Sequence, residues 1–148
     1  MLAEPTADHY LLGVEGSMRP RYRDLFKRMR HPDPDEADKA YDDVLFERHE
    51  ALADLVECYG VSRKDAILRF LVVQLMGFSG ASAAVMPLIG ALDDPDPAVR
   101  AEACRALEDL KARDGLPALK NRLNDLSADV RDAAREAISA LETRRSSA

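Results

Sequence analysis

Apolar residues in the second half of the chain recur with helical spacing, and the same pattern occurs twice. Residues 94–110 align with residues 125–141, and every matched pair is 31 positions apart. In the first copy Val99, Ala103 and Leu107 follow one another at intervals of four residues. This spacing places apolar side chains on one side of an α-helix.

A third, weaker copy precedes these two. Leu68, Val72 and Met76 stand 31 positions before Val99, Ala103 and Leu107. Similarity at a fixed period is typical of repeat proteins, in which one small unit stacks on the next. We therefore expect stacked units over at least residues 62–145.

Each copy predicts two antiparallel helices. Asp96 with Pro97, and Ser127 in the next copy, are expected to start the second helix, because Asp and Ser cap free N–H groups and proline suits the first turn. Gly115 and Pro117 open the helix between them.

The front of the chain is less regular. One amphipathic helix is predicted to end at Gly60, with a further helix starting at Ser62. Its apolar-face residues are Tyr41, Leu45, Phe46, His49, Leu52, Ala53 and Val56. We divide the chain into a lead-in and basic segment, 1–35, and a helical repeat domain, 36–148, whose clearest repeats are 94–124 and 125–145.

Residues 70–92 carry no charge at all. A run of this length is long enough to span a bilayer. However, Gly77-Phe-Ser-Gly-Ala-Ser82 at its centre has the composition of a turn. We therefore predict a buried pair of helices rather than a membrane span.

The composition fits one soluble domain. The 148 residues are 47% hydrophobic and 32% charged, with a formal net charge of −6. Cys58 and Cys104 lie far apart and lack metal-site spacing, so both are predicted to be reduced core thiols. The N-terminus shows no secretory signal pattern, which predicts a cytoplasmic protein.

Charge is unevenly distributed at the front. Residues 18–30 hold six cations and the single anion Asp24, whereas residues 31–60 hold ten acids and two bases. The cations are Arg19, Arg21, Arg23, Lys27, Arg28 and Arg30. Either this segment packs on the acidic stretch, with Leu25, Phe26 and Met29 making it a cap, or it is a docking arm for an acidic partner.

The runs Asp94-Pro-Asp-Pro-Ala-Val-Arg100 and Asp125-Leu-Ser-Ala-Asp-Val-Arg131, each followed by an Ala-rich helix, carry a family resemblance. They resemble HEAT-like repeats of the short kind found in phycobilisome lyase subunits. The resemblance implies an all-α fold, a short HEAT-like α-solenoid of antiparallel helix pairs, with an irregular helical N-terminal segment. It also implies that the acids and arginines of these runs form ladders between neighbouring repeats.

His49-Glu50 resembles the pairs that supply iron ligands in HEAT-like deoxyhypusine hydroxylases. The chain has one such pair, and neither His9 nor His31 has an adjacent acid. A metal site needs several converging donors. We therefore expect no metal and no cofactor. The sequence shows no recognisable catalytic arrangement, so we also expect a non-enzymatic role.

These observations predict a non-catalytic scaffold or adaptor that binds a protein partner through helix faces opposite the apolar stripes. The predicted partner-binding residues are Arg69, Arg105, Glu108, Asp109, Arg135 and Glu136. Exposed solenoid ends also allow a homo-oligomer. The alternatives are an accessory subunit of a lyase-type or other enzyme and, third, a nucleic-acid binder through residues 19–30. The acidic charge and the absence of Trp make nucleic acid an unlikely partner, and a membrane is equally unlikely.

Overall fold

The chain forms a row of helix pairs. The computed structural model describes residues 18–146, and within that range it contains helices but no strand. The α-helices are α2 (Pro20–Arg28), α3 (Pro34–Phe46), α4 (Leu52–Val61), α5 (Ala66–Phe78), α6 (Val85–Ala91), α7 (Pro97–Asp109), α8 (Leu116–Asn121) and α9 (Ala128–Ser146). Short 3₁₀ helices are η1 (Ser82–Ala84), η2 (Arg113–Gly115) and η3 (Arg122–Asn124).

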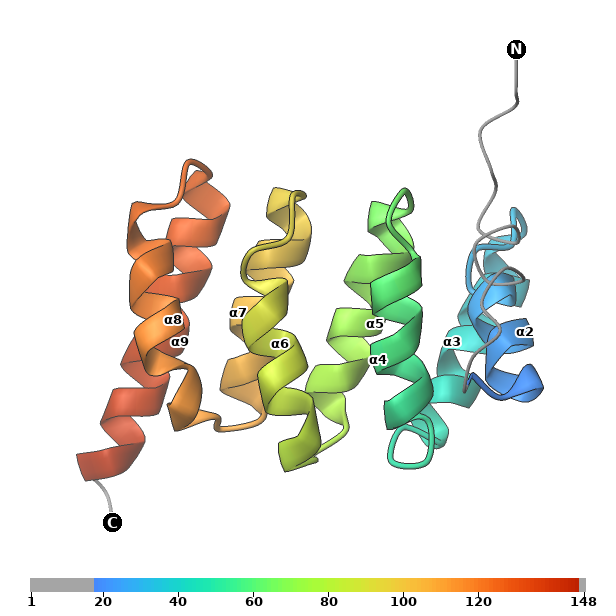
Figure 1. The fold of residues 1–148 in the computed structure, drawn as a ribbon, viewed down its shortest axis with the longest axis horizontal. Helices are drawn as coiled ribbons and strands as arrows, with labels where there is room; N and C mark the ends of the chain where they lie inside the picture. Colours follow the sequence, from blue (N-terminus) through green and yellow to red (C-terminus); the bar gives the residue numbers. More distant parts are fainter. Residues whose placement is uncertain (1–17, 147–148) are drawn as a thin grey trace.

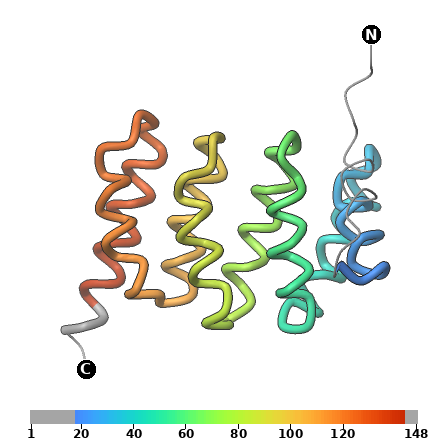
Figure 2. The backbone as a smooth tube through the Cα atoms, in the orientation of Figure 1, coloured from blue at the N-terminus to red at the C-terminus, as the bar shows by residue number. Residues whose placement is uncertain are grey.

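Consecutive helices pair, and the pairs stand side by side (Figure 1). The pairs are α2 with α3, α4 with α5, α6 with α7, and α8 with α9. The second helices of the pairs form one layer and the first helices form another, an alternation that the tube in Figure 2 follows from end to end. The predicted fold, a short all-α solenoid of antiparallel helix pairs, is confirmed.

The predicted starts of the second helices are confirmed. Asp96 accepts hydrogen bonds from two backbone N–H groups in the first turn of α7, and Pro97 is the first residue of that helix. Asp33 and Asp65 cap α3 and α5 through their side chains in the same way. Helix α9 begins directly after Ser127.

The predicted apolar stripes meet in one core. Val99, Ala103 and Leu107 of α7 are fully buried, as are Val130 and Ala134 at the matching positions of α9. Side chains of this kind stabilise the fold mainly by leaving water. The two cysteines are free and buried, and burial raises the pKa of each thiol to about 12.

The uncharged run at residues 70–92 forms parts of two helices. It covers most of α5 and all of α6, and the chain reverses between them at residues 79–81. Gly80 in this turn has a φ of 68°, a left-handed conformation that favours glycine. Among residues 18–146, no helix is both long and apolar enough to cross a membrane.

The single helix predicted to end at Gly60 is wrong. The structure divides it at residues 47–51 into α3 and α4, and α5 starts at Ala66 rather than Ser62. The physical reason is that α3 packs against α2, whereas α4 packs against α5, so the chain has to reverse between them. Arg48 and Arg19 donate hydrogen bonds to backbone carbonyl groups at this break.

The basic segment is a packed helix. Residues 19–30 contain α2, whose Tyr22, Leu25 and Phe26 are buried together with Met29. The apolar edge therefore packs this segment on the row as a cap, and the docking of an acidic partner by its cations stays a prediction. Residues 1–17, expected to be a lead-in, lie outside the described residues.

Helices α5 and α7 approach each other through small residues, and this contact is testable. A Cβ added at Gly77 would lie 2.8 Å from Ala106 Cα and Cβ, whereas one at Gly90 would meet no atom within 4 Å. We expect Gly77→Ala to lower the free energy of unfolding by about 1–3 kcal/mol through overpacking. Gly90→Ala should raise it by about 0.4–1 kcal/mol, because alanine has less freedom in the unfolded chain. Urea denaturation measures both, and equal effects would contradict the close approach.

Candidate protein-interaction site

Buried ion pairs join successive repeats at one edge of the row. Arg69 of α5 donates from Nε and Nη2 to the carboxylate of Asp94, at 2.9 and 3.0 Å. The side chains are only 7% and 1% exposed. Tyr59 Oη adds a third hydrogen bond to Asp94 at 2.6 Å. Burial alone would raise the pKa of Asp94, but the hydrogen bonds from Arg69 and Tyr59 outweigh it and hold the pKa below its ordinary value.

The next repeat forms the same pair. Arg100 of α7 donates from Nε and Nη2 to Asp125, both at 3.0 Å. Its Nη1 donates to the backbone carbonyls of Asp94 and Pro95 in its own turn. Hydrogen bonds from Arg100 hold the pKa of Asp125 below its ordinary value against the effect of burial. We call each such bidentate pair a rung.

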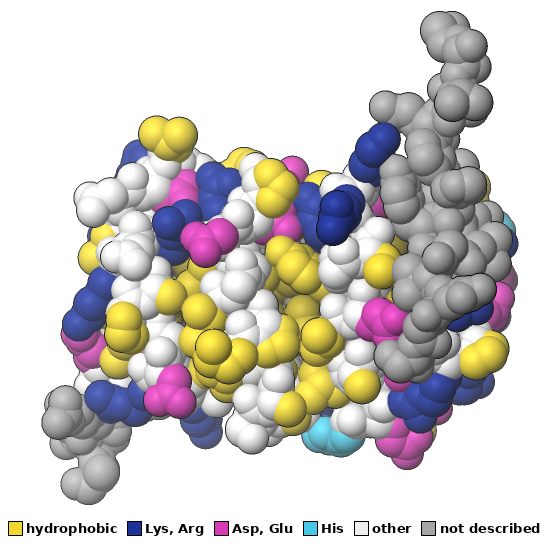
Figure 3. All heavy atoms as spheres, viewed as in Figure 1, with side chains coloured by type: hydrophobic (Ala, Val, Ile, Leu, Met, Phe, Trp, Pro, Cys, Tyr) yellow, Lys and Arg dark blue, Asp and Glu magenta, His cyan; other side chains and the backbone are white. Residues whose placement is uncertain are grey.

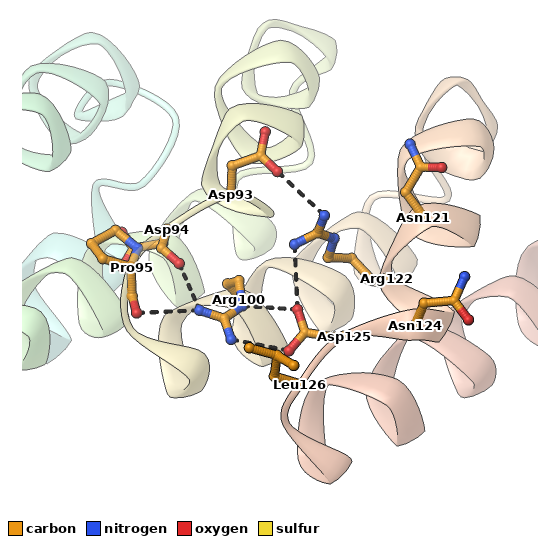
Figure 4. A pocket seen from close by; sticks show the side chains of 9 residues that line it. All are labelled: Asp93, Asp94, Pro95, Arg100, Asn121, Arg122, Asn124, Asp125 and Leu126. Carbon is orange, nitrogen blue, oxygen red and sulfur yellow. Dashed lines mark hydrogen bonds and ion pairs between the residues drawn. The ribbon is translucent and has the colours of Figure 1, made fainter.

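A pocket of about 380 Å³ lies beside the second rung. Figure 4 shows Arg122 between Asp93 and Asp125, with Arg100 linking Asp125 to the preceding turn. The charged side chains that line the pocket are already paired: Asp94 with Arg69, and Asp93, Arg100, Arg122 and Asp125 with one another. These charged residues therefore serve as contacts between repeats. The ladder between neighbouring repeats that the resemblance implied is present in the structure.

The rungs begin and end within the described chain. In the turn before α5, Arg63 stands two residues before the cap Asp65, where the turn before α7 has Asp94 two residues before Asp96, so α3 has no rung aspartate. At the other end, Arg131 Nη1 donates to the Asp125 carbonyl at 2.7 Å. No carboxylate within residues 18–146 pairs with Arg131.

Comparison with known families agrees with this geometry. The family model for HEAT repeats matches residues 52–139. The chain belongs to the HEAT-repeat family.

One solved structure similar to this HEAT-repeat protein is the complex of CpcE and CpcF of phycocyanin lyase from Nostoc sp. PCC7120. Its sequence is 18% identical, the TM-score is 0.44, and the alignment covers 97% of this chain and 70% of that one. No curated protein matches the chain in sequence.

The predicted partner-binding residues do not all share one surface. Arg69 is buried in the first rung, so its placement on an exposed face is wrong. Arg105, Asp109 and Glu136 are exposed and Glu108 is half-buried. Arg105 pairs with Glu102 at 3.3 Å, and burial raises the pKa of Glu102 despite that ion pair.

Arg135 lies at the C-terminal end of the row instead. It pairs with Asp132 at 2.9 Å, and both side chains are exposed. The matching positions in α7 are Ala101 and Cys104, which are buried. This end of the HEAT-repeat protein is therefore polar, as is typical of a capping repeat.

Most cations of the basic segment bind acids of the same chain. Arg19, Arg21, Arg28 and Arg30 pair with the carboxylates of Asp54, Glu47, Glu36 and Asp65 respectively. Arg28 also pairs with Asp24, Arg23 donates to the Met18 carbonyl, and Lys27 is not free. The acidic stretch thus neutralises the basic one in place.

His49 and Glu50 lie in the turn between α3 and α4 and are exposed. Residues 18–146 contain no group of three or more His, Cys, Asp or Glu side chains that would hold a metal ion. His49 is therefore a turn residue, and the prediction that it lies on a helix is wrong.

Sequence reasoning missed the most exposed large apolar side chains of the second-helix layer. Phe46 is 86% exposed, Ile67 56% and Phe78 43%. Phe46 and Phe78 are each the last residue of a 13-residue helix, so they hold equivalent positions in α3 and α5. The repeat alignment could have revealed this exposure. Asp109 ends the 13-residue α7 at the position that Phe46 and Phe78 hold in α3 and α5, and a charged residue at one copy of a position indicates that the position faces solvent.

These residues define a candidate docking surface. Along α5, Ile67, Leu71, Gln74 and Phe78 recur at the spacing of one helix side. On α3, Asp42 and Phe46 recur four residues apart. We call these six residues the α3–α5 face.

The α3–α5 face is held by two cross-links. Tyr41 Oη of α3 donates to Gln74 Oε1 of α5 at 2.5 Å, and burial raises the pKa of Tyr41 to about 12. Arg48 donates from Nε to the Phe78 carbonyl at 2.9 Å and from Nη1 to the Leu45 carbonyl at 3.0 Å. The ends of α3 and α5 are therefore fixed relative to each other.

Removing the acid of the first rung should strongly destabilise the protein. Asp94→Asn leaves the Arg69 charge buried without its counter-ion, and we expect a loss of roughly 3–5 kcal/mol in the free energy of unfolding. Asp132→Asn removes an acid from an exposed ion pair and should change it by less than about 1 kcal/mol. Urea denaturation of both variants is the measurement, and similar losses would show that the rung is not a main support.

The rungs should also make stability depend on pH. Asp94 and Asp125 have lowered pKa values in the folded chain, so their contribution is complete above the unfolded pKa of about 3.9 and is lost as the pH falls through the folded pKa. We expect the free energy of unfolding of the wild type to drop more steeply below about pH 4 than that of an Asp94→Asn variant. Parallel curves would contradict the lowered pKa of Asp94.

Proposed function

We propose that this HEAT-repeat protein is a non-catalytic scaffold that binds a protein partner on the α3–α5 face. The observation that carries the proposal is the pair of exposed phenylalanines, Phe46 and Phe78, at equivalent positions of adjacent repeats. Aromatic side chains are enriched among the residues that dominate binding energy at protein interfaces. Neighbouring repeats that present them in register form a continuous surface.

The rigidity of the surface supports this role. Arg48 and the Tyr41–Gln74 hydrogen bond hold α3 and α5 together before any partner arrives. A preformed surface loses less conformational entropy on association. The exposed phenylalanines therefore need little rearrangement to serve as anchors.

The first-helix layer has an apolar area of its own. Figure 3 shows hydrophobic side chains gathered over α4 and α6 in the middle of that layer. Met86 of α6 is 72% exposed there, and Val85 and Ile89 are half-buried. This area has one strongly exposed large side chain and no aromatic one, so it ranks below the α3–α5 face.

The other predicted functions receive less support. Four cations of residues 19–30 are occupied by acids of the chain itself, which leaves fewer for nucleic acid. The polar C-terminal end, with Asp132 and Arg135 exposed, does not favour a homo-oligomer joined there. An accessory role beside an enzyme stays a prediction that is compatible with partner binding.

Capture of partners from cells that make the protein tests the proposal. We expect wild type to retain a stoichiometric protein, and Phe46→Ser with Phe78→Ser to lose it, because the anchors are gone. Met86→Ser is the matched control, since it removes a large apolar side chain from the other layer whose exposure, 72%, lies between those of Phe46 and Phe78. Retention by the double variant, or loss with Met86→Ser alone, would place the partner elsewhere.

A further inference from the structure

We propose that the partner segment seated on the α3–α5 face is a basic amphipathic helix. This inference rests on the proposed function and adds the chemistry of the partner. It follows from the shape of the apolar stripe, from the charges beside it and from the absence of sheet in the described part of the chain.

The apolar stripe has the length of a short helix. Ile67, Leu71 and Phe78 lie along one side of α5, and the distance from the first to the last is about 16 Å at 1.5 Å per residue. Phe46 ends α3 as Phe78 ends α5, at the equivalent position of the neighbouring repeat. An amphipathic helix with apolar residues at positions i, i+4 and i+7 matches such a stripe.

The charges beside the stripe on α3 are mainly negative. The exposed charged residues of α3 are Asp35, Asp38, Lys39, Asp42 and Asp43, of which Asp43 lies near Arg21 of α2. The exposed cations Arg63 and Lys64 stand in the turn before Ile67. On the other side of α5, helix α7 has the exposed Asp109 and Arg105, and both are already engaged, Arg105 by Glu102.

A partner with Lys or Arg beside its apolar residues would therefore be attracted and oriented. Complementary charge raises the rate of encounter and fixes the register of a complex. The same acids repel nucleic acid and anionic lipid surfaces, so those ligands do not fit this face. Residues 18–146 contain no strand whose edge could receive an extended peptide.

The α4–α6 area does not specify a partner in this way. Helix α6 carries no charged residue, and α4 contributes the buried Asp54 and the half-buried Glu57, so no exposed charge on these two helices gives a partner a register. It serves as the internal comparison in the experiment.

Two synthetic peptides test the proposal on the full chain. Both have 15 residues and leucine at positions i, i+4, i+7 and i+11; one has lysine on the flanks of the leucine stripe and the other has glutamate. Fluorescence anisotropy of the labelled peptides gives the dissociation constants. We expect the lysine peptide to bind wild type at least about tenfold more tightly than the glutamate peptide, with affinity falling as salt increases.

Matched variants locate the binding. Phe46→Ser with Phe78→Ser should weaken the lysine peptide by about tenfold or more, and Met86→Ser should leave it unchanged. Asp42→Lys should weaken the lysine peptide by about threefold and strengthen the glutamate peptide, as expected for a charge at the edge of an interface. Asp114→Lys changes the net charge by the same amount at an exposed site in η2, away from the α3–α5 face. It should leave the affinities of both peptides unchanged.

The outcomes separate the two proposals. Equal affinity of the two peptides, or binding that survives loss of both phenylalanines, overturns the basic helix as the occupant. If partner capture still depends on Phe46 and Phe78 in that case, the docking surface stands and its partner has different chemistry. If capture is independent of the phenylalanines, the proposed function itself falls. Circular dichroism and thermal unfolding confirm that each variant is folded.

Discussion

The bidentate pair between an arginine of one repeat and an aspartate of the next is the interaction on which the stacking depends. Arg100 binds its own turn through Nη1 and the next turn through Nε and Nη2, so one guanidinium ties three segments of backbone together. Arg69 does the same with Asp94 at a site that excludes water. A buried charge of this kind is tolerated only when its partner and its hydrogen bonds are complete. The rung therefore sets the distance and register at which α5, α7 and α9 pack.

The ends of the row show what happens where the rung stops. The turn before α5 carries Arg63 where the turn before α7 carries Asp94. The first pair is therefore attached by other contacts: Arg19 binds the buried Asp54, and Arg30 binds Asp65, the residue that caps α5. The basic segment is consequently part of the fold, which is why its charge says little about a partner. At the opposite end, Asp132 and Arg135 replace the buried Ala101 and Cys104, and the row ends in a polar surface.

Between these ends, the packed helices keep large apolar side chains exposed to solvent. Phe46 and Phe78 end two helices whose tips are tied together by Arg48, and their exposure offers no benefit to the fold itself, since apolar surface is favoured inside. Exposed acids of α3 lie on the same helix as Phe46, whereas α6, in the apolar area that Figure 3 shows over α4 and α6, has no charged residue. The combination of fixed aromatic side chains with mainly negative charge on α3 is what distinguishes the α3–α5 face as the proposed binding surface.

The sequence by itself determined the repeat, the helix starts at Asp96 and after Ser127, the turn within the uncharged run, and the role of Asp94 and Asp125 in a ladder. The repeat, the helix starts and the turn are local or recur at a constant offset, so periodicity reveals them, and the ladder role is what the resemblance to HEAT-like repeats implied. Periodicity did not reveal that Arg69 is buried, that the segment before Gly60 is broken, or that Phe46 is exposed. Apolar spacing alone predicts that Phe46 faces a core, but α3 packs on α2 while α4 packs on α5. Only the tertiary structure decided which helix each side chain meets, because burial depends on neighbours that lie far apart in the chain.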